Sequence, residues 1–98
     1  MGWVESPINA IARTIAGEGN YEAYATTSLY VERPFSSDVT TITITNDDTA
    51  QNIQFSYDGA TLEGELRPAE TVTVQTTVRE KIYVKSDTGG AVCRIWGW

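Results

Sequence analysis

Hydrophobic and polar residues alternate along most of this chain. In the stretch TITIT, Ile42 and Ile44 share one face while threonines line the other, and NIQFSY repeats the pattern with Ile53 and Phe55. A period of two is typical of a strand with one buried and one solvated face. The alternation predicts strands over about residues 25–32, 39–45, 52–57, 62–66, 71–76, 80–85 and 92–98.

Short strands at intervals of about ten residues, with no helical segment between them, predict an antiparallel β-sandwich of the immunoglobulin-like or jelly-roll kind. Turn residues separate the strands: NDDTAQ follows the second predicted strand, YDG follows the third, and Pro68 precedes the strand at residue 71. The predicted core contains Ile42, Ile44, Ile53, Phe55, Val72, Val74, Ile82 and Val84.

The first residues follow a different period. In SPINAIARTIAGEG, Ser6 can cap a helix, and Ile8, Ile11 and Ile15 recur at helical spacing. These residues predict an amphipathic helix of about ten residues, too short to be stable alone. Its isoleucine stripe must therefore pack on something, either its own domain or a neighbouring subunit. The predicted organisation is an N-terminal arm with the helix, residues 1–24, and a β-sandwich domain, residues 25–98.

Size and charge narrow the possible partners. Ninety-eight residues suit one domain, and 13 acidic against 7 basic residues give a net charge of -6. That charge disfavours nucleic acid and anionic membranes as partners. The start of the chain lacks the basic and apolar pattern of a signal peptide, and no apolar run approaches the roughly 20 residues that cross a bilayer. We therefore expect a soluble protein that binds neither nucleic acid nor membrane.

The chain offers little catalytic chemistry. It contains no histidine, and Cys93 is its only cysteine, so disulfide frameworks, zinc sites and triads with an imidazole base are disfavoured. Cys93 is expected to be a small buried hydrophobe rather than a reactive thiol, because no basic neighbour would lower its pKa.

Two pairs of acidic residues are possible sites. Asp47 and Asp48 lack the regularly spaced oxygen ligands of a calcium loop, so turn formation is favoured. Glu63 and Glu65 would point the same way from a strand and could form an acid/base pair, but a solvated edge explains them better. We expect a protein that is not an enzyme, with no catalytic, metal or cofactor site.

The last seven residues, VCRIWGW, raise the question of what covers two terminal tryptophans. Alternation places Cys93 and Ile95 on one face and Trp96 and Trp98 on the other. We expect the first face to join the core and the second to meet a partner. Gly97 is interpreted as a point where another backbone comes close. The candidate subunit-interface residues are Trp3, Ile8, Ile11, Ile15, Trp96 and Trp98.

The residues TITITNDDTAQNIQFSYDGATLEGELRPAETVTV, followed by KIYVKSDTGGAVCRIWGW, resemble small β-sandwich structural proteins of tailed bacteriophage virions, among them capsid decoration and tail-associated proteins. The resemblance covers about residues 39–98 and lies in the order of strands and turns. It implies a virion component made in the bacterial host cytoplasm, with a decoration or cement role favoured. The implied partners are major capsid, portal-proximal or tail subunits, and other copies of the same chain in a homo-oligomer.

A carbohydrate-binding or host-recognition module of a phage fibre or tail is the alternative. In NYEAYATTSLY, Tyr21, Tyr24 and Tyr30 could form a platform for sugar rings. Their spacing does not suit one strand face, because Tyr21 and Tyr24 are three residues apart. The structural role is therefore preferred.

Overall fold

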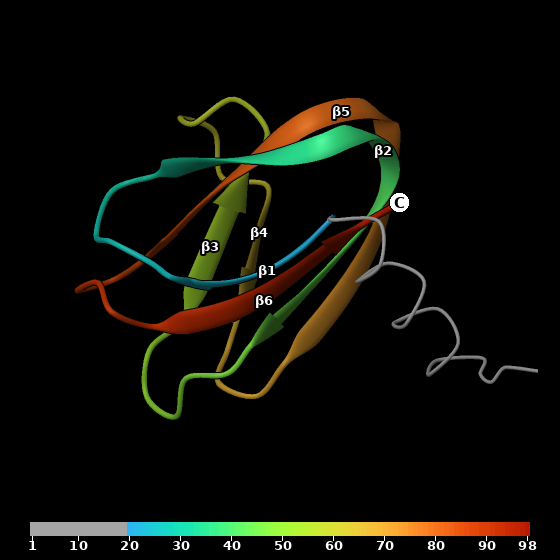
Figure 1. Ribbon diagram of the computed structural model, residues 1–98. Helices are drawn as coiled ribbons and strands as arrows, with labels where there is room; N and C mark the ends of the chain where they lie inside the picture. Colours follow the sequence, from blue (N-terminus) through green and yellow to red (C-terminus); the bar gives the residue numbers. More distant parts are fainter. Residues whose placement is uncertain (1–19) are drawn as a thin grey trace, which may run out of the picture.

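The computed structural model describes residues 20–98, and these form one six-stranded antiparallel sheet (Figure 1). The strand order across the sheet is β1-β6-β2-β5-β3-β4. The all-β antiparallel class predicted from the alternating pattern is confirmed. The strands are β1 (Tyr21–Ala25), β2 (Val31–Asn46), β3 (Ile53–Ser56), β4 (Gly64–Leu66), β5 (Thr71–Ser86) and β6 (Val92–Gly97).

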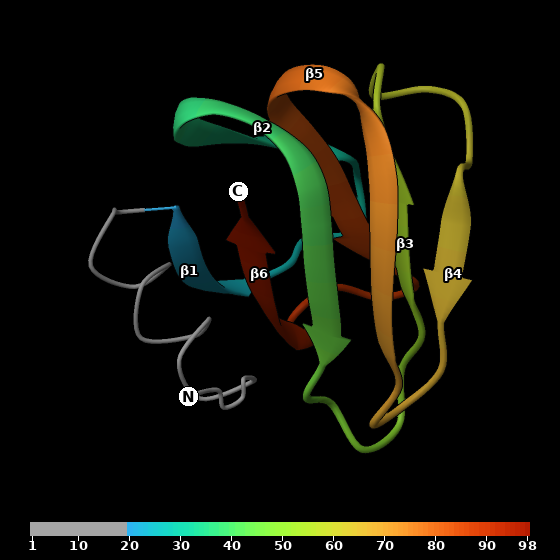
Figure 2. The ribbon, with the colours of Figure 1, turned by 90° about the vertical axis from the view of Figure 1, so that its right-hand side faces the viewer.

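The two long strands, β2 and β5, are each shared between two parts of the sheet. Residues 41–45 of β2 pair with the start of β5 and with β6, whereas residues 31–34 pair with the later part of β5, which also pairs with β3. The register between β2 and β5 shifts on either side of Val39, and such irregularities bend strands. Both strands bend sharply part-way along (Figure 1, Figure 2). We call the side with β1 and β6 the β6 part, and the side with β3 and β4 the β3 part.

Side chains from both parts meet in one hydrophobic core. Ile44 from the β6 part and Ile82 from the β3 part have no solvent exposure, and burying such a side chain contributes about 1.5–3 kcal/mol. The predicted core is confirmed, with Val72 and Val74 partly buried against the rest. The buried cluster comprises Val39, Ile42, Ile44, Ile53, Phe55, Leu66, Ile82, Val84, Ala91, Cys93 and Ile95.

The strand predicted over residues 25–32 does not form. β1 ends at Ala25 and β2 begins at Val31, and the residues between them form no strand. Thr26 fixes this connection: its amide donates to the carbonyl oxygen of Ala91 at 2.9 Å, and its buried hydroxyl lies 2.7 Å from the same oxygen. Side-chain bonds of this kind compete with strand pairing, and a sequence pattern does not reveal them.

Other predicted strands are parts of longer ones. β2 continues back through Pro34, between the segments predicted over residues 25–32 and 39–45, and the segments predicted over residues 71–76 and 80–85 are continuous in β5. Pro34 lies in the portion of β2 that pairs with β5 but not with β6. A proline is tolerated there because a strand with a neighbour on one side only can lack an N–H without losing a ladder hydrogen bond.

Asn46, at the end of β2, connects two loops through a fully buried side chain. Its Nδ2 donates to the carbonyl oxygens of Gln51 at 2.9 Å and Leu66 at 3.1 Å, and its Oδ1 accepts from the amide of Asp48 at 2.9 Å. The buried amide is therefore paired at both ends, as buried polar groups must be. These bonds connect the loop after β2 to the end of β4.

The two ends of the described chain lie side by side. The amide of Gly97 donates to the carbonyl oxygen of Asn20 at 2.9 Å, and Trp98 exchanges backbone hydrogen bonds with Thr41. A Cβ at Gly97 would lie 2.7 Å from the Phe35 ring and 2.9 Å from Val39 Cγ1. The close approach expected at this glycine is therefore made by side chains and not by a backbone.

The predicted helix and its isoleucine stripe lie outside the described residues. Residues 21–24, assigned to the arm from the sequence, belong to β1 in the structure. Residues 20–98 contain no helix that is long and apolar enough to cross a bilayer.

We predict that Gly64→Ala destabilises the fold by about 1–3 kcal/mol, because the added methyl overpacks the core. Gly64 pairs with Phe55, and a Cβ there would lie 2.6 Å from the Phe55 ring, which is only 3 % exposed. Chemical denaturation measures the loss. In a Phe55→Leu background the same change should cost clearly less; an equal cost in both backgrounds would show that the ring is not the obstacle.

Candidate functional site

The outer surface of the β6 part carries three aromatic side chains beside threonines. Pairing sets Tyr21 of β1 beside Trp96 of β6, and Trp96 beside Thr43 of β2. Thr43 is in turn opposite Thr73 of β5. Because side chains opposite one another share a face, these four residues form one row across the sheet. We call this surface, with Trp98 and the neighbouring threonines 41, 45 and 71, the aromatic face.

Trp96 is held on this face by contacts on two sides. The rings of Tyr21 and Trp96 are tilted by 42°, with centroids 5.1 Å apart. The Arg94 guanidinium carbon lies 5.3 Å from the centre of the Trp96 ring, and Arg94 Nε donates to Asp47 Oδ2 at 2.7 Å. This hydrogen bond raises the pKa of Arg94 above its ordinary value. The arrangement leaves Trp96 half-buried and fixes its ring.

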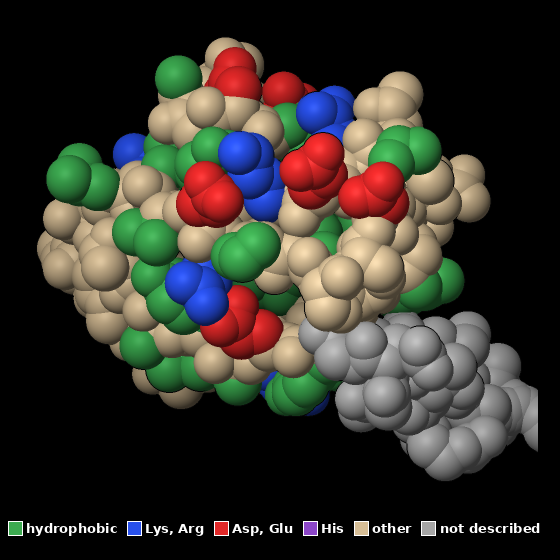
Figure 3. Space-filling view, turned by 45° about the horizontal axis from the view of Figure 1, so that its top comes forward, with side chains coloured by type: hydrophobic (Ala, Val, Ile, Leu, Met, Phe, Trp, Pro, Cys, Tyr) green, Lys and Arg blue, Asp and Glu red, His purple; other side chains and the backbone are tan. Residues whose placement is uncertain are grey.

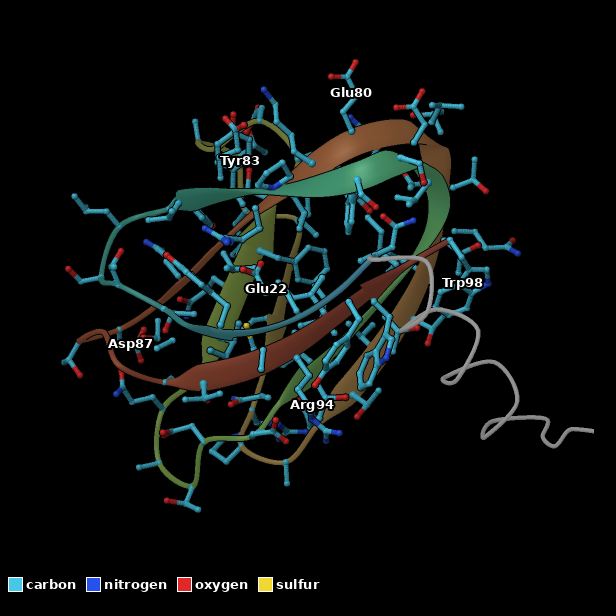
Figure 4. The ribbon with its side chains drawn as sticks, in the orientation of Figure 1. Glu22, Glu80, Tyr83, Asp87, Arg94 and Trp98 are labelled. Carbon is cyan, nitrogen blue, oxygen red and sulfur yellow. The ribbon has the colours of Figure 1, made fainter. Side chains whose placement is uncertain are left out.

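Trp98 is fixed through its backbone, while its side chain remains accessible. Its amide donates to Thr41 O at 3.0 Å and its carbonyl accepts from Thr41 N at 2.9 Å. The residue nevertheless keeps 42 % of its surface exposed. Figure 4 shows Trp98 at the far end of β6 from the β5–β6 connection. A large aromatic side chain on a rigid backbone is well suited to make an intermolecular contact.

The threonines beside the aromatic rings are paired with one another. Thr43 and Thr73 hydroxyls lie 2.9 Å apart, and those of Thr45 and Thr71 lie 2.8 Å apart. Paired hydroxyls keep these side chains in fixed orientations across β2 and β5. The centre of the face therefore carries hydroxyl and methyl groups, and the Arg94–Asp47 ion pair stands at its margin.

A second feature lies between β1 and the first portion of β2, where a hollow of about 200 Å³ is lined by Glu22, Arg33 and Phe35 among others. Arg33 binds Glu22 with two nitrogens, one of them, Nε, 2.8 Å from Oε1, and this bond raises the pKa of the guanidinium. Asn20 Oδ1 accepts from the amide of Ser36 at 3.0 Å. Figure 4 shows Glu22 between β1 and β2. These bonds join two strands that are not neighbours in the sheet.

The structure groups the predicted site residues differently from the sequence analysis. Trp96 and Trp98 do share a surface, and Tyr21 joins them there. Tyr24 faces the other side of β1, under the Arg33 guanidinium at 4.2 Å, and Tyr30 lies near Lys85, whose Nζ is 4.9 Å from its ring centre. The three tyrosines thus do not form one platform. Four candidate interface residues lie outside the described part of the chain: Trp3, Ile8, Ile11 and Ile15.

Of the two acidic pairs, Asp47, Asp48 and Glu65 make side-chain contacts within the fold. Asp48 accepts hydrogen bonds from the amides of Gln51 and Ala50, which lower the pKa of its carboxyl, so the expected turn is present. Glu65 lies on the short strand β4 and accepts a hydrogen bond from Gln54.

Within residues 20–98 no group of three or more His, Cys, Asp or Glu side chains is placed to hold a metal ion. Charges of both signs are interspersed over the surface seen in Figure 3.

Cys93 is part of the core, as the sequence indicated. It has no solvent exposure, and burial, with smaller contributions from Glu22 and Asp47, raises the pKa of its thiol to about 12. A thiol with such a pKa carries almost no thiolate near neutral pH and is a poor nucleophile.

Similarity to known proteins extends to the fold only. No protein-family model matches the chain, and no curated protein matches it in sequence. PirA superposes with a TM-score of 0.52 at 10 % identity, covering 81 % of this chain and 94 % of that chain. NMB1881 from Neisseria meningitidis gives 0.47 at 14 % identity, covering 80 % and 72 %. The C-terminal CBM6 of LamC from Zobellia galactanivorans gives 0.33 at 17 % identity, covering 81 % and 73 %.

We predict that the Cys93 thiol of the folded protein does not react with a chromogenic disulfide reagent at pH 8, because burial keeps it protonated and inaccessible. The same reagent should modify one thiol per chain in denaturant. Absorbance during labelling measures both rates. Rapid labelling of the native protein, at a rate near that of the denatured chain, would contradict the buried position.

Proposed function

We propose that this protein is a non-enzymatic structural component of a tailed-phage virion and that the aromatic face binds a neighbouring capsid or tail subunit. The observation that carries the proposal is the exposed Trp98 beside the fixed pair of Tyr21 and Trp96. We further propose that the bent sheet is a jelly-roll-like β-sandwich, with its β6 and β3 parts as the two layers. The resemblance of residues 39–98 to small virion proteins supports both proposals.

The composition of the aromatic face suits a protein partner. Tryptophan, tyrosine and arginine are the residue types that most often dominate binding energy at interfaces, and Trp96, Tyr21 and Arg94 stand together here. The threonine side chains beside them are neutral and held in place by their hydroxyl pairs, so burying them requires little ordering. The Arg94–Asp47 pair at the margin resembles the charged rim of such an interface.

A sugar ligand is the second candidate function, favoured by one observation. An accessible indole next to a row of hydroxyl groups offers both a ring surface for stacking and polar partners for sugar hydroxyls. This platform consists of Tyr21, Trp96 and Trp98, in place of the three tyrosines considered from the sequence. Sugar binding would use the same face, so the ligand distinguishes the two functions.

We predict that Trp96→Ala lowers the free energy of unfolding by about 1–2 kcal/mol, because it removes a half-buried ring that packs against Tyr21. Trp98→Ala should change it by less than half as much, since Trp98 keeps 42 % of its surface exposed and its backbone bonds remain. Thermal and chemical denaturation of both variants measure the difference. Equal destabilisation would show that Trp98 belongs to the core and would contradict a partner-facing role.

We also predict that Trp98→Ala reduces incorporation of the protein into phage particles at least about tenfold, the effect expected for an interface anchor. Leu29→Ala is the matched control, because Leu29 is 74 % exposed on the loop between β1 and β2. Quantitative mass spectrometry of purified particles measures incorporation. Normal incorporation of the Trp98 variant would contradict the proposal. Binding of purified protein to bacterial surface polysaccharide, lost in the same variant, would instead establish the sugar function.

A further inference from the structure

A strip of small and apolar side chains runs along the outer surface of β1 and β6. Three exposed residues at alternate positions of β1 lie opposite three residues of β6, and side chains opposite one another share a face. We call these six residues the β1–β6 strip: Tyr21, Ala23, Ala25, Val92, Arg94 and Trp96.

The β1–β6 strip has the composition of a covered surface. Arg94 is its one charged residue, and the guanidinium is bound to Asp47. Ala23 and Ala25 are exposed, and Val92 keeps 40 % of its surface accessible. The solvated face of an antiparallel sheet is normally polar, so a contiguous surface of this kind indicates that another segment packs on it.

The chain enters the sheet at one end of this strip. The carbonyl oxygen of Asn20 accepts a hydrogen bond from the amide of Gly97 at 2.9 Å, which fixes residue 20 next to Tyr21. The other face of β1 is already occupied, because Glu22 binds Arg33 and the Tyr24 ring lies under the same guanidinium. A segment that precedes β1 and packs on it therefore meets the β1–β6 strip.

The preceding segment carries an apolar stripe at the right distance along the chain. Ile8, Ile11 and Ile15 recur at helical spacing, and only AGEG, residues 16–19, separates them from Asn20. Four residues span at most about 14 Å, and a glycine just after a helix allows the chain to turn sharply. The stripe must be buried close by, because a helix of about ten residues is not stable alone.

We propose that residues 6–15 form a helix that packs on the β1–β6 strip of the same chain, antiparallel to β1. From Ile8 to Ile15 a helix rises about 10 Å, and the exposed positions of β1 span about 13 Å along the strand, so stripe and strip match in length. In this arrangement Ile11, at the centre of the stripe, lies over Ala23, whose small side chain lets the helix approach closely.

The short connection favours the helix's own chain over another molecule. A tether of four residues holds the two surfaces at an effective concentration in the millimolar range, which a second molecule does not reach at ordinary protein concentrations. Trp98 and the threonines of β2 and β5 lie outside the strip. They stay open to the partner proposed above, and the inference does not rest on that function.

The test bridges pairs of introduced cysteines in the full chain with a short bis-maleimide. I11C/A23C joins the centre of the stripe to the centre of the strip, and Ala23 is exposed, so the substitution there keeps the fold, which circular dichroism checks. Cys93 does not compete for the reagent, because it has no solvent exposure. We expect bridging within one chain to be at least about tenfold faster than in two control pairs, as measured by intact-protein mass spectrometry over time.

Each control moves one cysteine of the pair. In N9C/A23C the first cysteine lies about 160° around the predicted helix from Ile11, on the side away from the sheet. In I11C/L62C the second lies at Leu62, which is 57 % exposed on the loop between β3 and β4. A rate for I11C/A23C no higher than for these pairs would overturn the proposal. Bridges between two chains, in place of bridges within one, would also overturn it. The isolated protein is sufficient for this test, so its outcome is independent of particle incorporation.

Discussion

The fold depends on two strands that each belong to both parts of the sheet. β2 and β5 pair with each other along much of their length, but β6 joins only the end of β2 and β3 joins only the end of β5. The irregular pairing around Val39 lets both strands bend between these regions. Because of this bend, Ile44 and Ile82, which lie in different parts of the sheet, pack in the same buried cluster. A straight pair would leave each part with one apolar face open to water.

Polar side chains, rather than apolar packing, join β1 to the first portion of β2. Glu22 and Arg33 both point toward the interior from strands that do not pair, and each neutralises the other. The pair is partly exposed, so solvent reduces its contribution to stability, but removing one partner would leave the other charge in a poor environment. The Asn20 side chain adds hydrogen bonds to the backbone and side chain of Ser36 at the same place. This side is therefore joined by specific polar partners instead of apolar packing.

The alternating pattern predicted the strands of the apolar core correctly, but not the strands that carry inward-facing charges. Period-two alternation was sufficient for Ile42, Ile44, Ile53 and Phe55, because each lies on a strand with one apolar face. It failed for β1 and for the start of β2, where Glu22 and Arg33 occupy inward positions and interrupt the apolar pattern. Only the partner across space makes such a charge acceptable, and one sequence does not show that partner. The aromatic face could be predicted only in part. Alternation placed Trp96 with Trp98, but the pairing of β1 with β6, which brings Tyr21 to the same face, cannot be read from the sequence.

The neighbouring positions of Asn20 and Trp98 affect how the domain can carry mechanical load. β1 and β6 are antiparallel, and residues 20 and 98 lie at the same end of that pair. A pulling force applied through these two residues would separate the strands one hydrogen bond at a time, the weakest way to load a sheet. A force spread over the surface of the β6 part would instead act on all of its strands together. The domain should therefore bear a larger force when partners bind the surface of the β6 part than when the force acts through residues 20 and 98.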